Sequence, residues 1–171
     1  RGMGILTDDM KRVVREQRLG FVATVCPDGT PNLSPKGTTT VWDDDHLVFA
    51  PICSPNTVAN LLQNPAVEIN VVDAVRRKGY RFKGTGQVLT EGPLYDGIMA
   101  MYRGEHSEDR LREADRRVEV LVVVKVDRAL PLISPAYDGG ATEDEVAEGW
   151  EWYWQSLWDS RRSSTEEGRR R

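Results

Sequence analysis

A run of alternating valines in the second half of the chain constrains the fold most strongly. In RVEVLVVVKVDRALPLI, residues 117–133, valine occupies every second position from Val118 to Val126. Because successive side chains of a β-strand point to opposite faces of a sheet, this period of two predicts a strand. It is the most clearly predicted element of the chain.

Other segments extend this strand into a sheet. Residues 20–42 are predicted to form a strand, a tight turn at Asp28 and Gly29, and a second strand. Further strands are predicted over residues 46–51, 66–73 and 78–92, and short helices over residues 6–20, 54–65 and 92–104. No strand–helix–strand rhythm connects them, so we predict an antiparallel sheet that closes into a small barrel.

Capping signals define the first two helices. Thr7 can cap the first helix and Gly20 can end it. The second helix begins with Ser54 as its cap and Pro55 at the first helical position, where the missing N–H costs nothing. Its apolar stripe is expected at Val58, Leu61 and Leu62.

The composition limits the size and the partners of the protein. With 171 residues, of which 39% are hydrophobic, we expect a single domain over residues 1–160 and a disordered tail over residues 161–171. The formal net charge of −4 argues against a nucleic-acid-binding protein, so small molecules are the expected partners. No apolar stretch approaches the roughly 20 residues that cross a bilayer, and the start of the chain has no signal-peptide block. We therefore expect no membrane contact and a cytoplasmic protein.

The reactive side chains show no pattern of a metal or nucleophilic site. Cys26 and Cys53 have no CxxC spacing and form no cluster with histidine, so no metal site is predicted. His46 and His106 lie in polar segments and are interpreted as surface residues, and no nucleophile triad is found. The catalytic residues therefore stay unassigned.

Hydrogen-bond donors gather around the start of the second helix. The N–H groups of a first turn have no intrahelical partner, and the helix dipole adds a partial positive charge there. Ser54, Asn56 and Thr57 can add side-chain hydrogen bonds, and Lys36 on the preceding strand pair can add a full charge. Two interpretations remain open: an ordinary capped helix, or an anion site suited to phosphate.

The order of these segments resembles a known family. FVATVCPDGTPNLSPKGT, HLVFAP, SPNTVANLLQNPAVEINVVD and YRFKGTGQVL, all within residues 19–89, are similar to the pyridoxamine 5'-phosphate oxidase-like, FMN-binding split-barrel family. The resemblance implies a mainly β (α+β) fold: a small antiparallel split β-barrel with short peripheral helices, assembled as a homodimer with FMN at the subunit interface. The residues that it implies for FMN binding are Ser34, Lys36, Gly37 and Thr38 on the flavin-lining strand, Ala50 and Pro51 at the end of the next strand, Ser54, Asn56 and Thr57 at the phosphate turn, and Lys83 on the strand that closes the site.

The resemblance implies an FMN-dependent oxidoreductase that acts on an unidentified small molecule. Vitamin oxidases of the family usually carry an Arg–Lys pair at the phosphate turn, where this chain has Asn56 and Thr57, and they end in a basic substrate-binding pattern that is absent here. Oxidation of pyridoxamine phosphate itself is therefore not expected. Two other classes stay open: a flavin or haem carrier or sensor without turnover, and a reductase that uses a deazaflavin.

An amphipathic helix rich in tryptophan is predicted near the end of the chain. In TEDEVAEGWEWYWQSLW, residues 142–158, Thr142 and Glu145 form a capping box, and three tryptophans follow Val146 at every fourth position. These are Trp150, Trp154 and Trp158. We expect the helix to pack near the dimer interface and to help cover the flavin groove, with Trp152 outward; the alternative is that it lids its own barrel.

Overall fold

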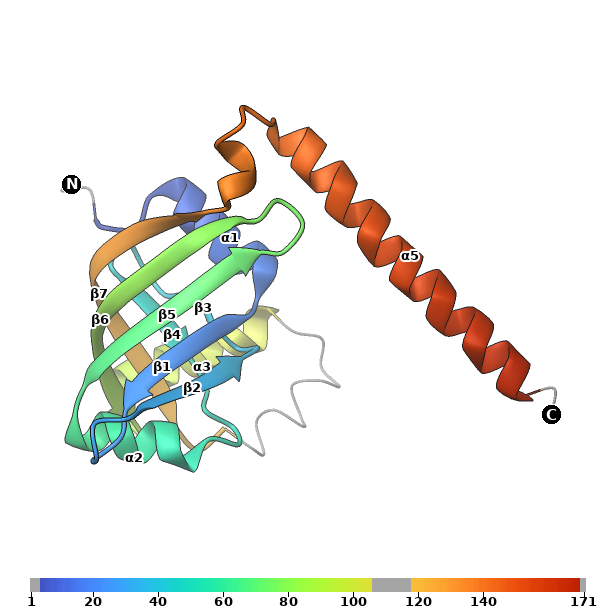
Figure 1. The fold of residues 1–171 in the computed structure, drawn as a ribbon. Coiled ribbons are helices and arrows are strands. Elements are labelled where there is room, and N and C mark those ends of the chain that lie inside the picture. Colours follow the sequence, from blue (N-terminus) through green and yellow to red (C-terminus); the bar gives the residue numbers. More distant parts are fainter. Residues whose placement is uncertain (1–3, 106–117, 170–171) are drawn as a thin grey trace.

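The computed structural model describes residues 4–105 and 118–169, and its centre is one curled sheet (Figure 1). Seven strands pair in the order β2-β1-β5-β6-β7-β4-β3, and every neighbouring pair is antiparallel. The strands are β1 (Gly20–Val25), β2 (Pro31–Lys36), β3 (Thr40–Val41), β4 (His46–Phe49), β5 (Ala66–Asp73), β6 (Lys78–Leu89) and β7 (Leu121–Ile133). The helices are α1 (Asp8–Gln17), α2 (Pro55–Gln63), α3 (Pro93–Glu105), the 3-10 turn η1 (Pro135–Tyr137) and α5 (Glu143–Arg169). The predicted mainly β split barrel is confirmed.

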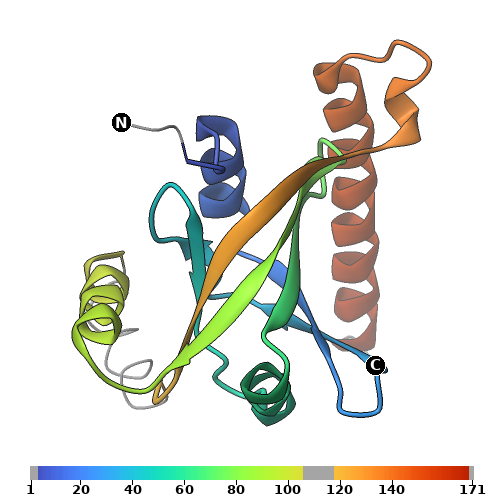
Figure 2. The same ribbon diagram turned by 90° about the vertical axis from the view of Figure 1, so that its left-hand side faces the viewer.

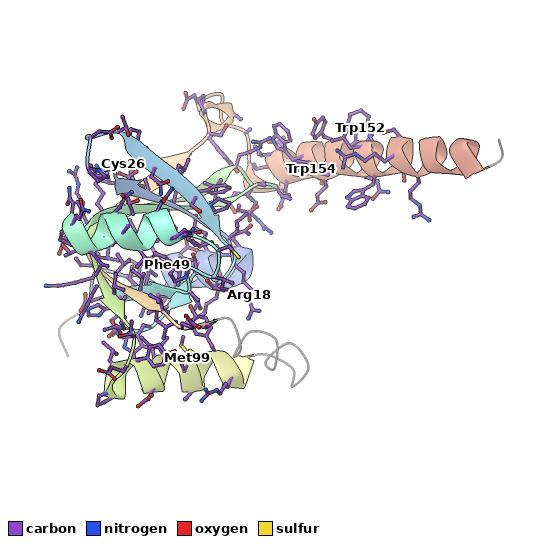
Figure 3. All side chains as sticks on the ribbon, turned by 90° about the horizontal axis from the view of Figure 1, so that it is seen from below. Arg18, Cys26, Phe49, Met99, Trp152 and Trp154 are labelled. Atoms are coloured by element: carbon purple, nitrogen blue, oxygen red, sulfur yellow. The ribbon has the colours of Figure 1, made fainter. Side chains whose placement is uncertain are left out.

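The sheet bends around one core and carries a second on its back. Inside the bend, the side chains of Val22, Ile69 and Phe82 are completely buried on three neighbouring strands. Helix α1 lies at one end of this half-barrel and α2 at the other (Figures 1 and 2). A second apolar cluster joins α3 to β4 and β7, and Met99 belongs to it (Figure 3).

A bulge in the longest strand pair gives Gly84 a structural role. β6 and β7 stay paired from Lys78 to Leu89, with a shift of register between Lys83 and Gly84. A Cβ atom added at Gly84 would lie 1.9 Å from the backbone oxygen of Lys125 on β7. The close approach of the two backbones therefore requires glycine at this position.

The end of α1 differs from the prediction. Thr7 caps the helix as expected, because its hydroxyl accepts a hydrogen bond from the N–H of Met10. The C-cap is Arg18, in the left-handed conformation with φ of 52°, and its N–H donates to Val14 O. Gly20, predicted to end the helix, instead starts β1, where a Cβ would meet the Thr39 side chain at 2.5 Å.

The buried face of α2 was also predicted incorrectly in part. Leu61 is buried as expected, but Leu62 is 70% exposed, and the other buried side chains of the helix are the polar Thr57 and Asn60. The Asn60 amide donates to Thr24 Oγ1 on β1 at 3.0 Å. A side-chain hydrogen bond to β1 therefore helps to hold α2 on the sheet, whereas the sequence predicted contacts of an apolar stripe.

Helix α5 extends away from the barrel as an arm (Figures 1 and 3). Its capping box forms as predicted: Thr142 N–H donates to Glu145 Oε2 at 2.8 Å, and Glu145 N–H donates to Thr142 Oγ1 at 3.3 Å. The helix does not lid its own barrel, and it continues to Arg169, into the predicted tail. The disorder of residues 161–171 and the extent of the domain over residues 1–160 stay predictions.

The described residues contain neither a membrane-spanning helix nor a cluster of metal ligands. Within residues 4–105 and 118–169, no helix is long and apolar enough to cross a membrane. In the same residues, no three histidine, cysteine, aspartate or glutamate side chains are placed to hold a metal ion together. His106 lies outside the described residues.

Candidate functional site

The candidate site is built around a buried lysine at the end of β2. Lys36 is only 3% exposed, and its Nζ donates hydrogen bonds to the hydroxyl of Ser34, two residues earlier on the same strand, and to the hydroxyl of Ser54 at 2.7 Å. Alternate residues of a strand point to the same face, so Ser34 and Lys36 share the inner side of β2. Three of the predicted site residues, Ser34, Lys36 and Ser54, are thus in contact, and they come from β2 and the start of α2.

The ammonium of Lys36 has no counter-charge within the part of the chain that the structure describes. Both of its partners there are neutral hydroxyls, and no carboxylate lies within ion-pair distance. Burial lowers the pKa of Lys36, because desolvation disfavours the charged form. A buried cation is costly unless it is paired, so this corner of the protein is suited to an anion.

The start of α2 supplies a further donor to the same corner. Ser54 occupies the N-cap position, but its side chain makes no cap bond and turns to Lys36 instead. The N–H groups of Thr57 and Val58 donate to Ser54 O, and Pro55 has no N–H. Among the described residues the Asn56 N–H has no acceptor, which leaves it available at the positive end of the helix dipole.

The other two polar side chains of the predicted phosphate turn, besides Ser54, point in different directions. Asn56 is exposed, whereas Thr57 is buried and accepts a hydrogen bond from the Asn32 amide at 3.4 Å. The same amide donates to Thr24 Oγ1 at 3.2 Å. Thr57 therefore fixes α2 against the sheet. The sequence analysis missed Asn32 and Asn60 as positioning residues, although an asparagine within a short helix was an available signal.

The remaining predicted residues of this corner form its wall. The Thr38 hydroxyl donates to Ala50 O at 3.1 Å and accepts from Ala50 N–H at 2.9 Å, so it ties the segment after β2 to the end of β4. Gly37 is exposed, and Pro51 is buried at the head of a cleft of about 400 Å³. This cleft begins beside Ser54, and its lining is mostly apolar, with Ile52, Pro55 and Val58, although Glu119 also borders it. An apolar cleft therefore adjoins the cationic corner.

Lys83 does not join this site within one chain. The Lys83 ammonium pairs with the Glu68 carboxylate on β5 at 3.2 Å. Across the sheet, Lys83 is paired with Glu68, Glu68 with Ala23, and Ala23 with Leu33, so these residues lie in one row on one face. Leu33 points away from the core, opposite to Ser34, so Lys83 lies on the other face of the sheet from Lys36. Its proposed role in closing the site stays a prediction that requires a second chain.

A larger cleft lies elsewhere, beside His46. The His46 Nδ1 is 2.8 Å from Asp43 Oδ1, and the cleft of about 540 Å³ also borders Trp42, Gln87 and Lys125. Burial would raise the pKa of the Asp43 carboxyl, but hydrogen bonds from Asp45 N–H and the His46 ring outweigh it and lower the pKa. His46 is thus partly exposed at the border of this cleft, and its ring is oriented by Asp43, a contact that the sequence did not predict.

Comparisons with known proteins agree with this architecture. A family model described as pyridoxamine 5'-phosphate oxidase matches residues 6–129. The structure of HupZ from Group A Streptococcus is 31% identical with a TM-score of 0.63, over 75% of this chain and 94% of that chain. An FMN-binding protein from Syntrophomonas wolfei is 18% identical with a TM-score of 0.59, over 74% and 85% of the two chains. An F420 reductase is 24% identical with a TM-score of 0.54, over 72% and 98%. No curated protein sequence matches the chain significantly.

The half-barrel, with helices at its two ends and a cationic corner between β2 and α2, places the chain among the split β-barrel proteins. The chain belongs to the pyridoxamine 5'-phosphate oxidase-like family, because the family model covers most of its length. The matched residues extend from α1 into β7 and end before α5. The arm is therefore an addition to the part that the family model describes.

Proposed function

We propose that this protein binds FMN with the phosphate at the Lys36 corner and acts as an oxidoreductase on a small molecule. The observation that carries the proposal is the buried ammonium of Lys36, held by two hydroxyls and without a carboxylate partner among the described residues. A dianionic phosphate supplies the charge that this ammonium lacks, and charge-assisted hydrogen bonds are the strongest that such a corner can make. Family membership supports a flavin as the carrier of that phosphate.

The chain's own residues have three roles in this proposal. Lys36, Ser54 and the Asn56 N–H bind the phosphate, and Thr38 and Ala50 hold the wall beside it. The apolar cleft next to Ser54 offers a surface that excludes water from a flat, poorly solvated group. When bound, the flavin ring itself accepts and passes on hydride or electrons, so few protein acids and bases are needed.

A second copy of the chain is part of the proposal. Lys36 is buried on the inner face of β2, and Lys83 lies on the opposite face of the same sheet. In a homodimer with the cofactor at the subunit interface, a residue on the outer face of one chain can reach the corner of its partner. Lys83 of the second chain then closes the site, as the family resemblance implies.

The absorption spectrum of the purified protein tests the cofactor. A flavin spectrum supports FMN, a strong Soret band supports the haem carrier, and a colourless protein that binds a deazaflavin supports the third class. For FMN, Lys36→Ala is expected to weaken binding by about 1–3 kcal/mol, the worth of a charge-assisted contact. Lys125→Ala, on β7 and away from the corner, is the matched control. Equal FMN affinity in the two variants removes Lys36 from the site.

Turnover is tested separately, on the loaded protein. Bleaching of the flavin by NADH or NADPH without oxygen, and its recovery on readmission of oxygen, are expected of an oxidoreductase. A flavin that stays oxidised with either donor supports the carrier or sensor instead. The two measurements thus separate binding from chemistry.

A further inference from the structure

We propose that α5 is a clasp that docks on the outer sheet face of a second copy of this chain. The outer sheet face is defined here by Phe21, Leu33, Pro35 and Val72, together with Glu68, Arg81 and Lys83. The occupant of each face is the α5 of the other copy, so the contact is made twice in a two-fold dimer. The inference uses the second copy invoked above but needs no cofactor.

The first turns of α5 are fixed to their own barrel. Val146 is buried, and the Lys78 ammonium pairs with Glu143 at 2.6 Å. The Arg77 guanidinium stacks on the Trp150 ring, with its central carbon 3.3 Å from the ring centroid. These contacts hold the base of the helix to the turn between β5 and β6, so they set the direction in which the arm leaves.

Beyond this base the aromatic side chains of the arm are uncovered. Trp152, Trp154 and Trp158 are 72%, 42% and 63% exposed, and Tyr153 is 43% exposed. The helix has 27 residues and is about 40 Å long, so most of it lies past the contacts with its own barrel. Figure 3 shows Trp152 and Trp154 on the projecting arm. Soluble proteins rarely leave so many large aromatics in water without a partner.

The outer sheet face is the matching surface on the barrel. Ala23 pairs with Leu33 and with Glu68, and Phe21 pairs with Pro35 and with Asn70, so these side chains form two rows across neighbouring strands. Leu33 is 65% exposed, and Phe21 and Val72 are also exposed. Alternation along β1 and β5 puts Val22 and Ile69 in the core and leaves this apolar surface outside.

The arm cannot be assigned to its own sheet face. Figure 2 shows α5 on the same side of the sheet as this face, and Figure 1 shows it displaced beyond the strands instead of lying across them. Its base is held by the Arg77 and Lys78 contacts in that position. In a two-fold dimer, the arm of each copy can lie on the uncovered outer sheet face of the other copy. The same contact then forms twice.

The arm and the outer sheet face match in area and in part in charge. Before Arg161 the charged groups of the arm are all acidic, namely Glu143, Asp144, Glu145, Glu148, Glu151 and Asp159. The outer sheet face carries Arg81 and Lys83, which both pair with Glu68, and Asp127 borders the same surface. Trp152 lies on the opposite side of the helix from Trp154 and Trp158, so the side that can dock holds Tyr153, Trp154 and Trp158 and offers about 300 Å². Two arms and two receiving faces then bury about 1,200 Å², the lower end of the range for stable interfaces.

The test compares two exposed apolar residues in the full chain. Leu33→Glu puts a carboxylate on the outer sheet face, and the control Ile5→Glu puts one on an exposed residue that lies beside Asp45, away from that face and from the cleft next to Ser54. Dimerisation is measured by sedimentation, and docking of the arm by tryptophan emission, because α5 holds four of the five tryptophans. We expect Leu33→Glu to raise the dimer dissociation constant about tenfold or more and to shift the emission to the red. Ile5→Glu is expected to change neither.

Each alternative result has a defined meaning. If Leu33→Glu and Ile5→Glu behave alike, the outer sheet face does not receive the arm and the clasp is excluded. A dimer that persists in Leu33→Glu with unchanged emission excludes the clasp but leaves the proposed dimeric flavin site intact. Emission that does not change when the wild-type protein is diluted to monomer also overturns the proposal, because docking on a second copy must be lost with that copy. Trp158→Glu repeats the test from the arm, and its dimer must weaken as in Leu33→Glu.

Discussion

Replacing Lys36 by methionine separates what this residue does for stability from what it does for binding. The ammonium is buried between two hydroxyls, and no carboxylate among the described residues offsets it. Methionine fills the space of the lysine stem without a charge. The hydroxyls of Ser34 and Ser54 lie 3.4 Å apart, close enough to bond to each other once the ammonium is gone. Few polar groups are therefore left without a partner.

The expected result is a more stable protein without ligand. Replacing a buried ion pair by apolar side chains of similar volume often stabilises a protein by about 1–4 kcal/mol, and for a single lysine with two hydrogen bonds we expect about 1 kcal/mol. Urea unfolding of ligand-free protein should show a higher midpoint at unchanged slope. With FMN at about 100 times the wild-type dissociation constant, the wild type gains about 2.7 kcal/mol and the variant much less. The order of stability is therefore expected to reverse.

The pH dependence follows from the lowered pKa of Lys36. The folded state binds this proton less readily than the unfolded state, whose lysine has the ordinary value of 10.5. The cost of the buried charge is therefore fully present below the folded-state pKa and disappears as the pH rises from that value towards 10.5. The advantage of Lys36→Met should shrink over the same window. A variant that is less stable than the wild type without ligand, or that gains equally from FMN, would refute this reasoning.

Three other substitutions test the frame around the site. Gly84→Ala should destabilise the fold by about 3 kcal/mol or more or prevent folding, because the new Cβ meets Lys125 O at 1.9 Å; a thermal transition like that of the wild type would contradict this. Tyr80→Phe removes the hydrogen bond to Asp9 that joins β6 to α1, and should cost about 1 kcal/mol in urea unfolding. Burial and that bond raise the pKa of Tyr80 to about 12, so the alkaline titration of the wild type should contain one late tyrosine that the variant lacks. Burial acts to raise the pKa of Asp73, but the hydrogen bonds that its carboxylate accepts outweigh burial and lower the pKa. Asp73→Asn should therefore cost about 1–3 kcal/mol of stability at neutral pH. The cost should be smaller in acid, because protonation of Asp73 then removes the same stability from the wild type.

The sequence predicted the parts of the fold that depend on local chemistry. The hydroxyl of Thr7, the positive φ of Gly29 in the first hairpin and the capping box at Thr142 each act within a few residues, so their signals are complete in the sequence. The period of two in β7 is also local, although the strand begins only at Leu121, after Val118 and Val120.

The errors lie where a distant strand determines the outcome. Leu62 was expected in the core, but Asn60 occupies the buried face of α2 because Thr24 on β1 offers it a hydrogen bond. Ser54 was expected to cap α2, but Lys36 attracts its hydroxyl. Each case needs the register of the sheet, which a single sequence does not contain.

The two edge strands of the sheet limit how copies of this protein can associate. One edge strand, β2, contains Pro31 and Pro35, which have no N–H to offer to a further strand. The other edge, β3, is only two residues long. Neither edge is a template for continued backbone pairing, so the sheet resists growth into a longer sheet or a fibril. Association is thereby directed to side chains on the faces, where a single substitution can control it.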